Sequence, residues 1–223
     1  RIAEAESLYR AVLDTASDQP EAVALLGVVC GAKGDTEESL LLAERAAALD
    51  PAAARFHFYL GNARLAVEDS AGAVAAFRAA LAIDSAFAEA WCTLGTALAV
   101  MKDWGEAEKA YAACVRLTPE EAAGWFALGV VLSRLERHEE ALEIYEKTRA
   151  LGIDWTILDN IAQTCVNLHQ FDRAEEAFRK IGAYKTAPRS EKENAFHGSH
   201  HHARPLRDDF TACCREDNGQ TIS

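Results

Sequence analysis

The sequence predicts an all-α protein built from an array of helix–turn–helix repeats. Four Leu–Gly pairs recur with a strict spacing of 34 residues and end at Gly27, Gly61, Gly95 and Gly129. Twelve positions after each of these glycines the chain carries a small residue: Ser39, Ala73, Ala107 and Ala141. None of the five prolines interrupts a predicted helix, as the missing N–H of proline requires. A fixed period between 20 and 50 residues is typical of stacked repeats.

Each repeat is expected to contain two helices joined by a short polar break. Five full repeats cover 20–53, 54–87, 88–121, 122–154 (one residue short) and 155–188. The glycine of the first helix and the small residue of the second lie where the two helices cross. A larger side chain there would hold the backbones apart, which explains a glycine inside a helix at a cost of about 1 kcal/mol relative to alanine.

The two ends of the chain differ from the full repeats. Residues 1–19 match only the second helix of a truncated repeat, through Ile2, Ala5, Tyr9 and Val12. We therefore expect the chain to be part of a longer protein or a truncated gene product. Residues 189–223 are polar, lack a helical period and are predicted to be disordered, with a short capping helix over 190–196 as an alternative.

Repeat 88–121 carries the most complete motif of the five. Its recurring residues are Trp91, Leu94, Gly95, Ala107, Tyr111 and Pro119. This motif resembles the signature of the tetratricopeptide repeat, and the resemblance covers about residues 1–188. It implies a right-handed α–α superhelix, or solenoid, whose first helices line an inner groove that holds a peptide or a partner helix. The last repeat departs most from the signature, because Leu158 and Ala162 replace the usual Trp and Gly.

Composition narrows the class of function and the cell compartment. The formal net charge of −12 disfavours a nucleic-acid or anionic membrane surface, which needs clustered Lys and Arg. No run of about 18 apolar residues predicts a membrane span. Six cysteines without a disulfide pattern favour a reducing compartment, so we predict a cytoplasmic protein, although a targeting segment could precede Arg1.

The inward positions of the first helices predict the binding surface. They carry aromatic and hydrogen-bonding side chains: Arg55, Phe58, Tyr59, Asn62, Thr93, Thr96, Phe126, Val130, Arg134, Asp159, Asn160, Gln163 and Asn167. Packing of Phe58 and Phe126 against neighbouring helices is the alternative. The carboxylate clamp and the asparagine ladder known in the family are both absent from the corresponding positions.

No catalytic motif is recognised, and we predict neither enzyme activity nor a cofactor. Three pairs with (i, i+4) spacing are interpreted as solvated ion pairs: Glu143–Lys147, Glu175–Arg179 and Glu176–Lys180. The histidines and cysteines of the tail fit no established zinc spacing, so no metal site is predicted. These residues are His197, His200, His201, His202, Cys213 and Cys214.

The leading hypothesis is a non-enzymatic scaffold that binds a peptide or a partner protein. The alternative is the substrate-recruiting arm of a larger enzyme, because residues 4–30 loosely resemble repeats appended to bacterial glycosyltransferases or sulfotransferases. Self-association through the exposed N-terminal helix is a third possibility.

Overall fold

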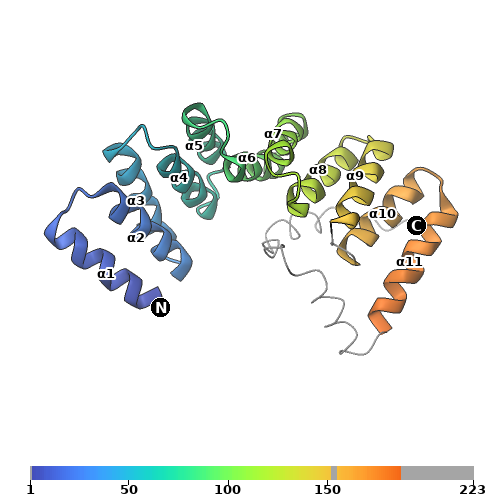
Figure 1. Ribbon diagram of the computed structural model, residues 1–223, viewed down its shortest axis with the longest axis horizontal. Coiled ribbons are helices and arrows are strands. Elements are labelled where there is room, and N and C mark those ends of the chain that lie inside the picture. Colours follow the sequence, from blue (N-terminus) through green and yellow to red (C-terminus); the bar gives the residue numbers. More distant parts are fainter. Residues whose placement is uncertain (1, 152–154, 187–223) are drawn as a thin grey trace. The chain divides into compact units, whose positions relative to one another are not determined.

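The computed structural model describes residues 2–151 and 155–186, which form eleven α-helices and no strand (Figure 1). The chain divides into two compact units between residues 102 and 103. The N-terminal unit holds α1 (Ile2–Thr15), α2 (Pro20–Lys33), α3 (Thr36–Leu49), α4 (Ala54–Ala66), α5 (Ser70–Ile83) and α6 (Ala88–Val100). The C-terminal unit holds α7 (Trp104–Leu117), α8 (Ala122–Arg134), α9 (His138–Ala150), α10 (Trp155–Asn167) and α11 (Phe171–Thr186). The prediction of an all-α repeat array is confirmed.

The helix starts follow the sequence period. First helices begin at residues 20, 54, 88, 122 and 155, and second helices begin at residues 36, 70, 104, 138 and 171. Three of the second helices are preceded by an aspartate whose side chain accepts a hydrogen bond from the backbone N–H three residues later: Asp35, Asp69 and Asp103. Such N-caps satisfy a backbone donor that the helix leaves unpaired.

The break between the two helices has a recurring backbone conformation. The fifteenth residue of each repeat has a positive φ: Gly34 (89°), Glu68 (62°), Lys102 (61°), Glu136 (60°) and His169 (57°). Only the first of these is a glycine, so four repeats place a side chain in the left-handed region at a steric cost. The geometry of the turn therefore overrides the local preference of the residue.

Glycine allows close packing of the two helices within a repeat. In Figure 1, α4 lies against α5 and α8 lies against α9. A Cβ atom added to Gly61 would lie 2.6 Å from Cδ1 of Phe77, and one added to Gly129 would lie 2.6 Å from Cε1 of Tyr145. At Gly27 the nearest atom is Cβ of Leu42 at 3.1 Å. The missing side chain of each glycine therefore leaves a notch in the first helix, and in the second and fourth repeats this notch accommodates the ring of Phe77 or Tyr145.

No helix in the described parts of the chain is both long and apolar enough to cross a membrane.

Candidate functional site

The first helices of the N-terminal unit lie next to one another, because α2 contacts α4 and α4 contacts α6. The ninth residue of each repeat therefore occupies an equivalent place on three adjacent helices. These residues are Val28, Asn62 and Thr96, and we call the surface that they mark the first-helix face. Val28 is 45% exposed, whereas Asn62 and Thr96 are half-buried.

Two predicted residues of the first-helix face keep polar groups available. The ring of Tyr59 packs against the buried cluster that contains Val23 and Phe56, which fixes its position on α4. Asn62 lies three residues further along the same helix. Within residues 2–151 and 155–186, no hydrogen bond to the Tyr59 hydroxyl or the Asn62 amide is present. Both side chains can therefore bond to an incoming group without breaking an internal contact.

The predicted threonines use their hydroxyl protons inside α6. The Thr93 hydroxyl donates to the carbonyl oxygen of Glu89 at 2.9 Å, and that of Thr96 donates to Cys92 at 3.2 Å. The Thr93 hydroxyl oxygen still has lone-pair capacity to accept a hydrogen bond from a ligand N–H.

Arg55 is engaged by its neighbours on the same face. Its guanidinium forms an ion pair with Glu21 of α2 and lies 5.2 Å from the ring centroid of Phe56. Both partners of the ion pair are about half exposed, with side-chain exposures of 55% and 52%. The pair links α2 to α4, and as an exposed ion pair it contributes little stability by itself.

The predicted aromatic residue Phe58 is occupied by packing. Its ring centroid lies 4.8 Å from that of Phe87 and 5.9 Å from that of Phe77. Offset or tilted aromatic pairs at such distances are favourable contacts. Phe58 therefore helps to join α4, α5 and the start of α6.

The predicted residues of the C-terminal unit divide into buried and exposed groups. Phe126 and Val130 are buried, with 6% and 7% exposure, and the Phe126 ring centroid lies 6.2 Å from that of Tyr145. Arg134 and Asn160 are half-buried, whereas Asp159, Gln163 and Asn167 are exposed. The Gln163 amide donates to Asn167 at 3.3 Å. Polar groups on α10, rather than rings on α8, are thus accessible in this unit.

Sequence reasoning missed two exposed aliphatic residues on the first helices. Val28 on α2 is 45% exposed and Val100 on α6 is 48% exposed. Their repeat positions, the ninth and the thirteenth, coincide with those of the predicted residues Asn62 and Arg134. The period could therefore have identified them, although apolar residues in a helix are more often buried.

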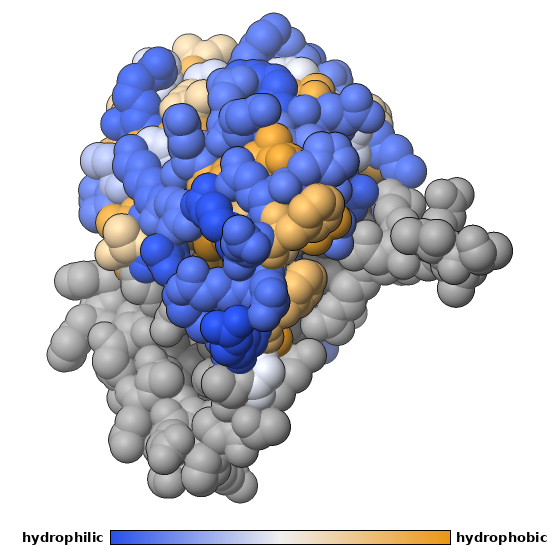
Figure 2. All heavy atoms as spheres, turned by 90° about the vertical axis from the view of Figure 1, so that its right-hand side faces the viewer, coloured by the Kyte–Doolittle hydropathy of each residue, from blue (hydrophilic) through white to orange (hydrophobic). Residues whose placement is uncertain are grey.

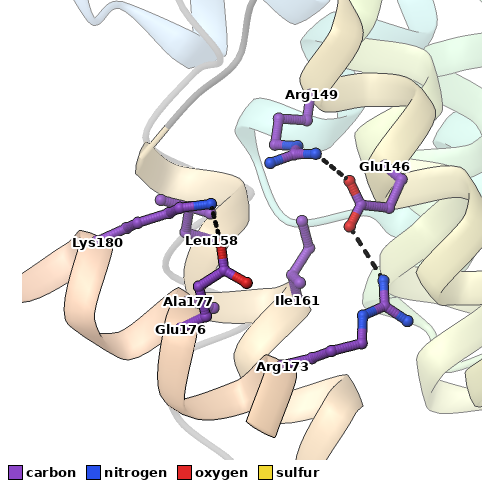
Figure 3. Close-up of a pocket in the computed structure, with 8 residues that line it drawn as sticks. All are labelled: Glu146, Arg149, Leu158, Ile161, Arg173, Glu176, Ala177 and Lys180. Carbon is purple, nitrogen blue, oxygen red and sulfur yellow. Dashed lines mark hydrogen bonds and ion pairs between the residues drawn. The ribbon is translucent and has the colours of Figure 1, made fainter. Parts of the chain in front are cut away.

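A pocket of about 130 Å³ lies between α9, α10 and α11 (Figure 3). Its lining residues are Glu146, Arg149, Leu158, Ile161, Arg173, Glu176, Ala177 and Lys180. Figure 2 shows that the described surface on this side of the molecule is mainly hydrophilic, with smaller apolar areas. No predicted site residue lines it.

Ion pairs surround the pocket. Glu146 pairs with Arg149 at 2.7 Å and with Arg173 at 3.3 Å, and Glu176 pairs with Lys180 at 2.8 Å. The hydrogen bond from Lys180 lowers the pKa of the Glu176 carboxyl below its usual value. All the charged groups of the pocket therefore have partners on α9 or α11.

Two of the three predicted (i, i+4) ion pairs are confirmed, Glu175–Arg179 and Glu176–Lys180, each at 2.8 Å. The third prediction, Glu143–Lys147, is wrong. Nζ of Lys147 lies 3.5 Å from the ring centroid of Trp125 instead. A cation over the face of a half-buried indole gains more than it does from an exposed carboxylate.

Metal ligands do not gather in the part of the chain that the structure describes, where no group of three or more His, Cys, Asp or Glu could hold an ion. The tail residues considered for metal binding, and the alternative helix over 190–196, lie outside the described residues.

Comparison with known proteins identifies the repeat. A family model described as tetratricopeptide repeat matches residues 1–52, 31–86 and 92–154, whereas no curated protein matches the sequence. Among solved structures, YrrB, described as a TPR protein with an unusual peptide-binding site, has a TM-score of 0.70 at 18% identity, covering 85% of this chain and 96% of its own. MamA from Desulfovibrio magneticus RS-1 has a TM-score of 0.67 at 20% identity, with 81% of this chain and 95% of that chain covered. PilF from Pseudomonas aeruginosa has a TM-score of 0.64 at 23% identity, with coverages of 73% and 75%. The repeat period, the glycine notches and the family match together show that the chain belongs to the tetratricopeptide repeat family.

Proposed function

We propose that the protein is a non-enzymatic scaffold that binds a peptide or a partner protein on the first-helix face of its N-terminal unit. The observation that carries this proposal is the accessible Tyr59 hydroxyl and Asn62 amide, which have no hydrogen-bond partner in the described residues. Both residues lie on α4, and the exposed Val28 lies on α2 at the repeat position that Asn62 has on α4.

The chemistry of this face suits an extended peptide. An asparagine side chain both donates and accepts, so Asn62 can bond to a peptide N–H and C=O. The Tyr59 hydroxyl supplies a further acceptor, and Val28 supplies apolar contact area. Rigid aromatic and neutral polar groups of this kind are typical of protein recognition surfaces. The similarity to YrrB is consistent with peptide binding, although at 18% identity it establishes the fold alone.

The proposal is tested with a peptide selected from a random displayed library on the full chain. Its dissociation constant is then measured by calorimetry for the wild type, Val28→Glu and Asn62→Ala. Leu41→Glu is the matched control, because Leu41 is an exposed aliphatic residue (67%) on the second helix α3. We expect each first-helix variant to bind at least about tenfold more weakly, which corresponds to the loss of a contact of about 1.4 kcal/mol.

If Leu41→Glu weakens peptide binding as much as the first-helix variants do, the effect is one of charge and the assignment of the binding site to the first-helix face is overturned. Unchanged peptide affinity in both Val28→Glu and Asn62→Ala would also overturn this assignment. Circular dichroism of each variant checks that the helices are retained.

Self-association through α1 stays a prediction. On this helix Ile2, Leu8 and Val12 are 50%, 67% and 43% exposed. Sedimentation velocity over a range of concentrations should show an oligomer that Leu8→Glu abolishes. A monomer at every concentration would contradict it.

A further inference from the structure

The fourth residue of each first helix fills the same place in three successive repeats. That residue is His57 in α4, Trp91 in α6 and Trp125 in α8. In each case a ring nitrogen lies 2.9 Å from the carbonyl oxygen six residues upstream, on Pro51, Ser85 and Pro119 respectively. An aromatic ring with this hydrogen bond therefore recurs in the three central repeats, whereas the first repeat has the fully buried Val23 at the same position.

The last repeat lacks that ring. Its fourth residue is Leu158, which is 6% exposed and forms part of the wall of the pocket of about 130 Å³ (Figure 3). Ile161 and Ala177, with exposures of 4% and 5%, are the other apolar residues that line it. The pocket thus lies where a leucine replaces the larger side chain. A cavity of roughly 150 Å³ holds a benzene molecule, so this pocket approaches the size of a single aromatic ring.

The lysines of the last two repeats show what the missing ring changes. Lys147 is the tenth residue of α9, and Lys180 is the tenth residue of α11. Each follows a glutamate by four positions, Glu143 and Glu176 respectively. Lys147 lies over the Trp125 ring, whereas Lys180 pairs with Glu176. With a ring present the lysine covers its face, and without one it turns to the carboxylate.

We propose that the pocket between α9, α10 and α11 binds an aromatic side chain of a peptide or partner protein. The ring would contact Leu158 and Ile161 and take the place that Trp125 fills in the preceding repeat. Lys180 would leave Glu176 and cover the ring face, as Lys147 covers Trp125. This site lies in the C-terminal unit and does not depend on the first-helix face.

The charges around the pocket select among aromatic ligands. Arg149, Arg173 and Lys180 outnumber Glu146 and Glu176 by one positive charge. Both arginines share Glu146, so neither is neutralised by a carboxylate of its own. A ring flanked by a carboxylate is therefore favoured over a ring that carries no charge, and over one flanked by a cation.

The test uses small probes and the full chain. N-acetyl-tryptophan, N-acetyl-tryptophanamide and N-acetyl-leucinamide are titrated while ¹⁵N NMR follows the backbone amides. We expect N-acetyl-tryptophan to bind with a Kd of about 1 mM, typical of a ligand of this size, and to shift amides of α10 and α11. The tryptophanamide should bind more weakly, and the leucine probe more weakly still.

Two variants separate this site from non-specific binding. Leu158→Trp should fill the pocket and weaken binding of N-acetyl-tryptophan at least tenfold. His57→Trp is its matched control, because it adds a tryptophan at the equivalent position of another repeat and should leave the affinity unchanged. Lys180→Gln leaves the apolar wall intact and should weaken the tryptophan probes more than the leucine probe.

Several results would overturn the proposal. They are equal affinity for the leucine and tryptophan probes, shifts confined to other helices, or undiminished binding to Leu158→Trp. Should Leu158→Trp fail to fold, Lys180→Gln decides the question, and equal effects on all three probes count against a ring site.

Discussion

The substitution Gly129→Ala tests the notch through which α8 packs against α9. The added Cβ would lie 2.6 Å from Cε1, 2.8 Å from Cδ1 and 3.2 Å from Cζ of the Tyr145 ring. Tyr145 is only 1% exposed, so its ring cannot move into solvent. The two helices must separate, or the ring must leave its preferred rotamer.

The expected magnitude follows from two opposing effects. Inserting a carbon atom into a well-packed core costs about 1–3 kcal/mol. Replacing a glycine by alanine inside a helix returns about 1 kcal/mol. Three atoms of the Tyr145 ring would lie within 3.2 Å of the added Cβ, and the ring is confined by its burial, so we take the upper part of the range for inserting a carbon atom. The net destabilisation is then about 1–2 kcal/mol.

Gly105→Ala is the matched control in the same unit. Gly105 lies in α7, and an added Cβ would meet nothing within 4 Å. This variant should be neutral or more stable by up to about 1 kcal/mol. Urea and thermal unfolding followed by circular dichroism compare both variants with the wild type. Equal stability of Gly129→Ala and Gly105→Ala would refute the notch.

The N-terminal unit offers a second test of the same reasoning. A Cβ on Gly61 would meet the ring of Phe77, which is fully buried. Gly61→Ala should therefore cost less in a Phe77→Leu background than in the wild type, because the smaller side chain leaves room. Additive effects of the two substitutions would contradict a direct clash.

Three further outcomes are expected. Hydrogen bonds from Lys33 and Arg10 hold the pKa of the Glu6 carboxyl below its ordinary value of 4.5, so the stability that this carboxylate contributes is present above that value and is lost as the pH falls through the folded-state pKa. The difference in unfolding free energy between wild type and Glu6→Gln should therefore shrink below about pH 4. A difference that stays constant with pH would contradict this prediction. Burial raises the pKa of the Cys30 thiol to about 11, so the reactive thiolate is scarce at pH 8. Mass spectrometry should therefore detect iodoacetamide modification of Cys30 at pH 8 only after denaturation. Rapid modification of Cys30 in the native protein would contradict this prediction. Glu136→Gly should raise the unfolding free energy by about 0.5 kcal/mol, because φ is 60° at this position and glycine adopts that region without steric cost. If the variant unfolds at a lower urea concentration than the wild type, the Glu136 side chain has another role.

The helical architecture could be predicted because its causes are local and repeated. The Leu–Gly pairs mark the helix crossings, and the aspartates at residues 35, 69 and 103 precede the second helices. The left-handed residues of the breaks could not be predicted in this way. Glu68 and Lys102 give no local sign of a positive φ, which the packing of the two flanking helices imposes on them.

The candidate site was less predictable than the fold. The period places Phe58 and Phe126 at the fifth position of their repeats and Asn62 at the ninth, and predicts that all three face inward. Their burial, however, depends on which ring the adjacent helix presents. Phe77 and Tyr145 engage the two phenylalanines, whereas Asn62 keeps its amide available. The absence of a tryptophan at Leu158 was visible in the sequence, but the pocket depends on α9 and α11 not closing over it.

Site-specific photo-crosslinking tests peptide binding on the first-helix face most directly. p-Benzoylphenylalanine is placed either at Val28 or at Leu41, two exposed aliphatic positions on α2 and α3. Irradiation in the presence of the library-selected peptide should give a cross-linked product only from the protein labelled at position 28, and an excess of unlabelled peptide should suppress it. Cross-linking from position 41 alone, or equal yields from both positions, would contradict binding at the first-helix face.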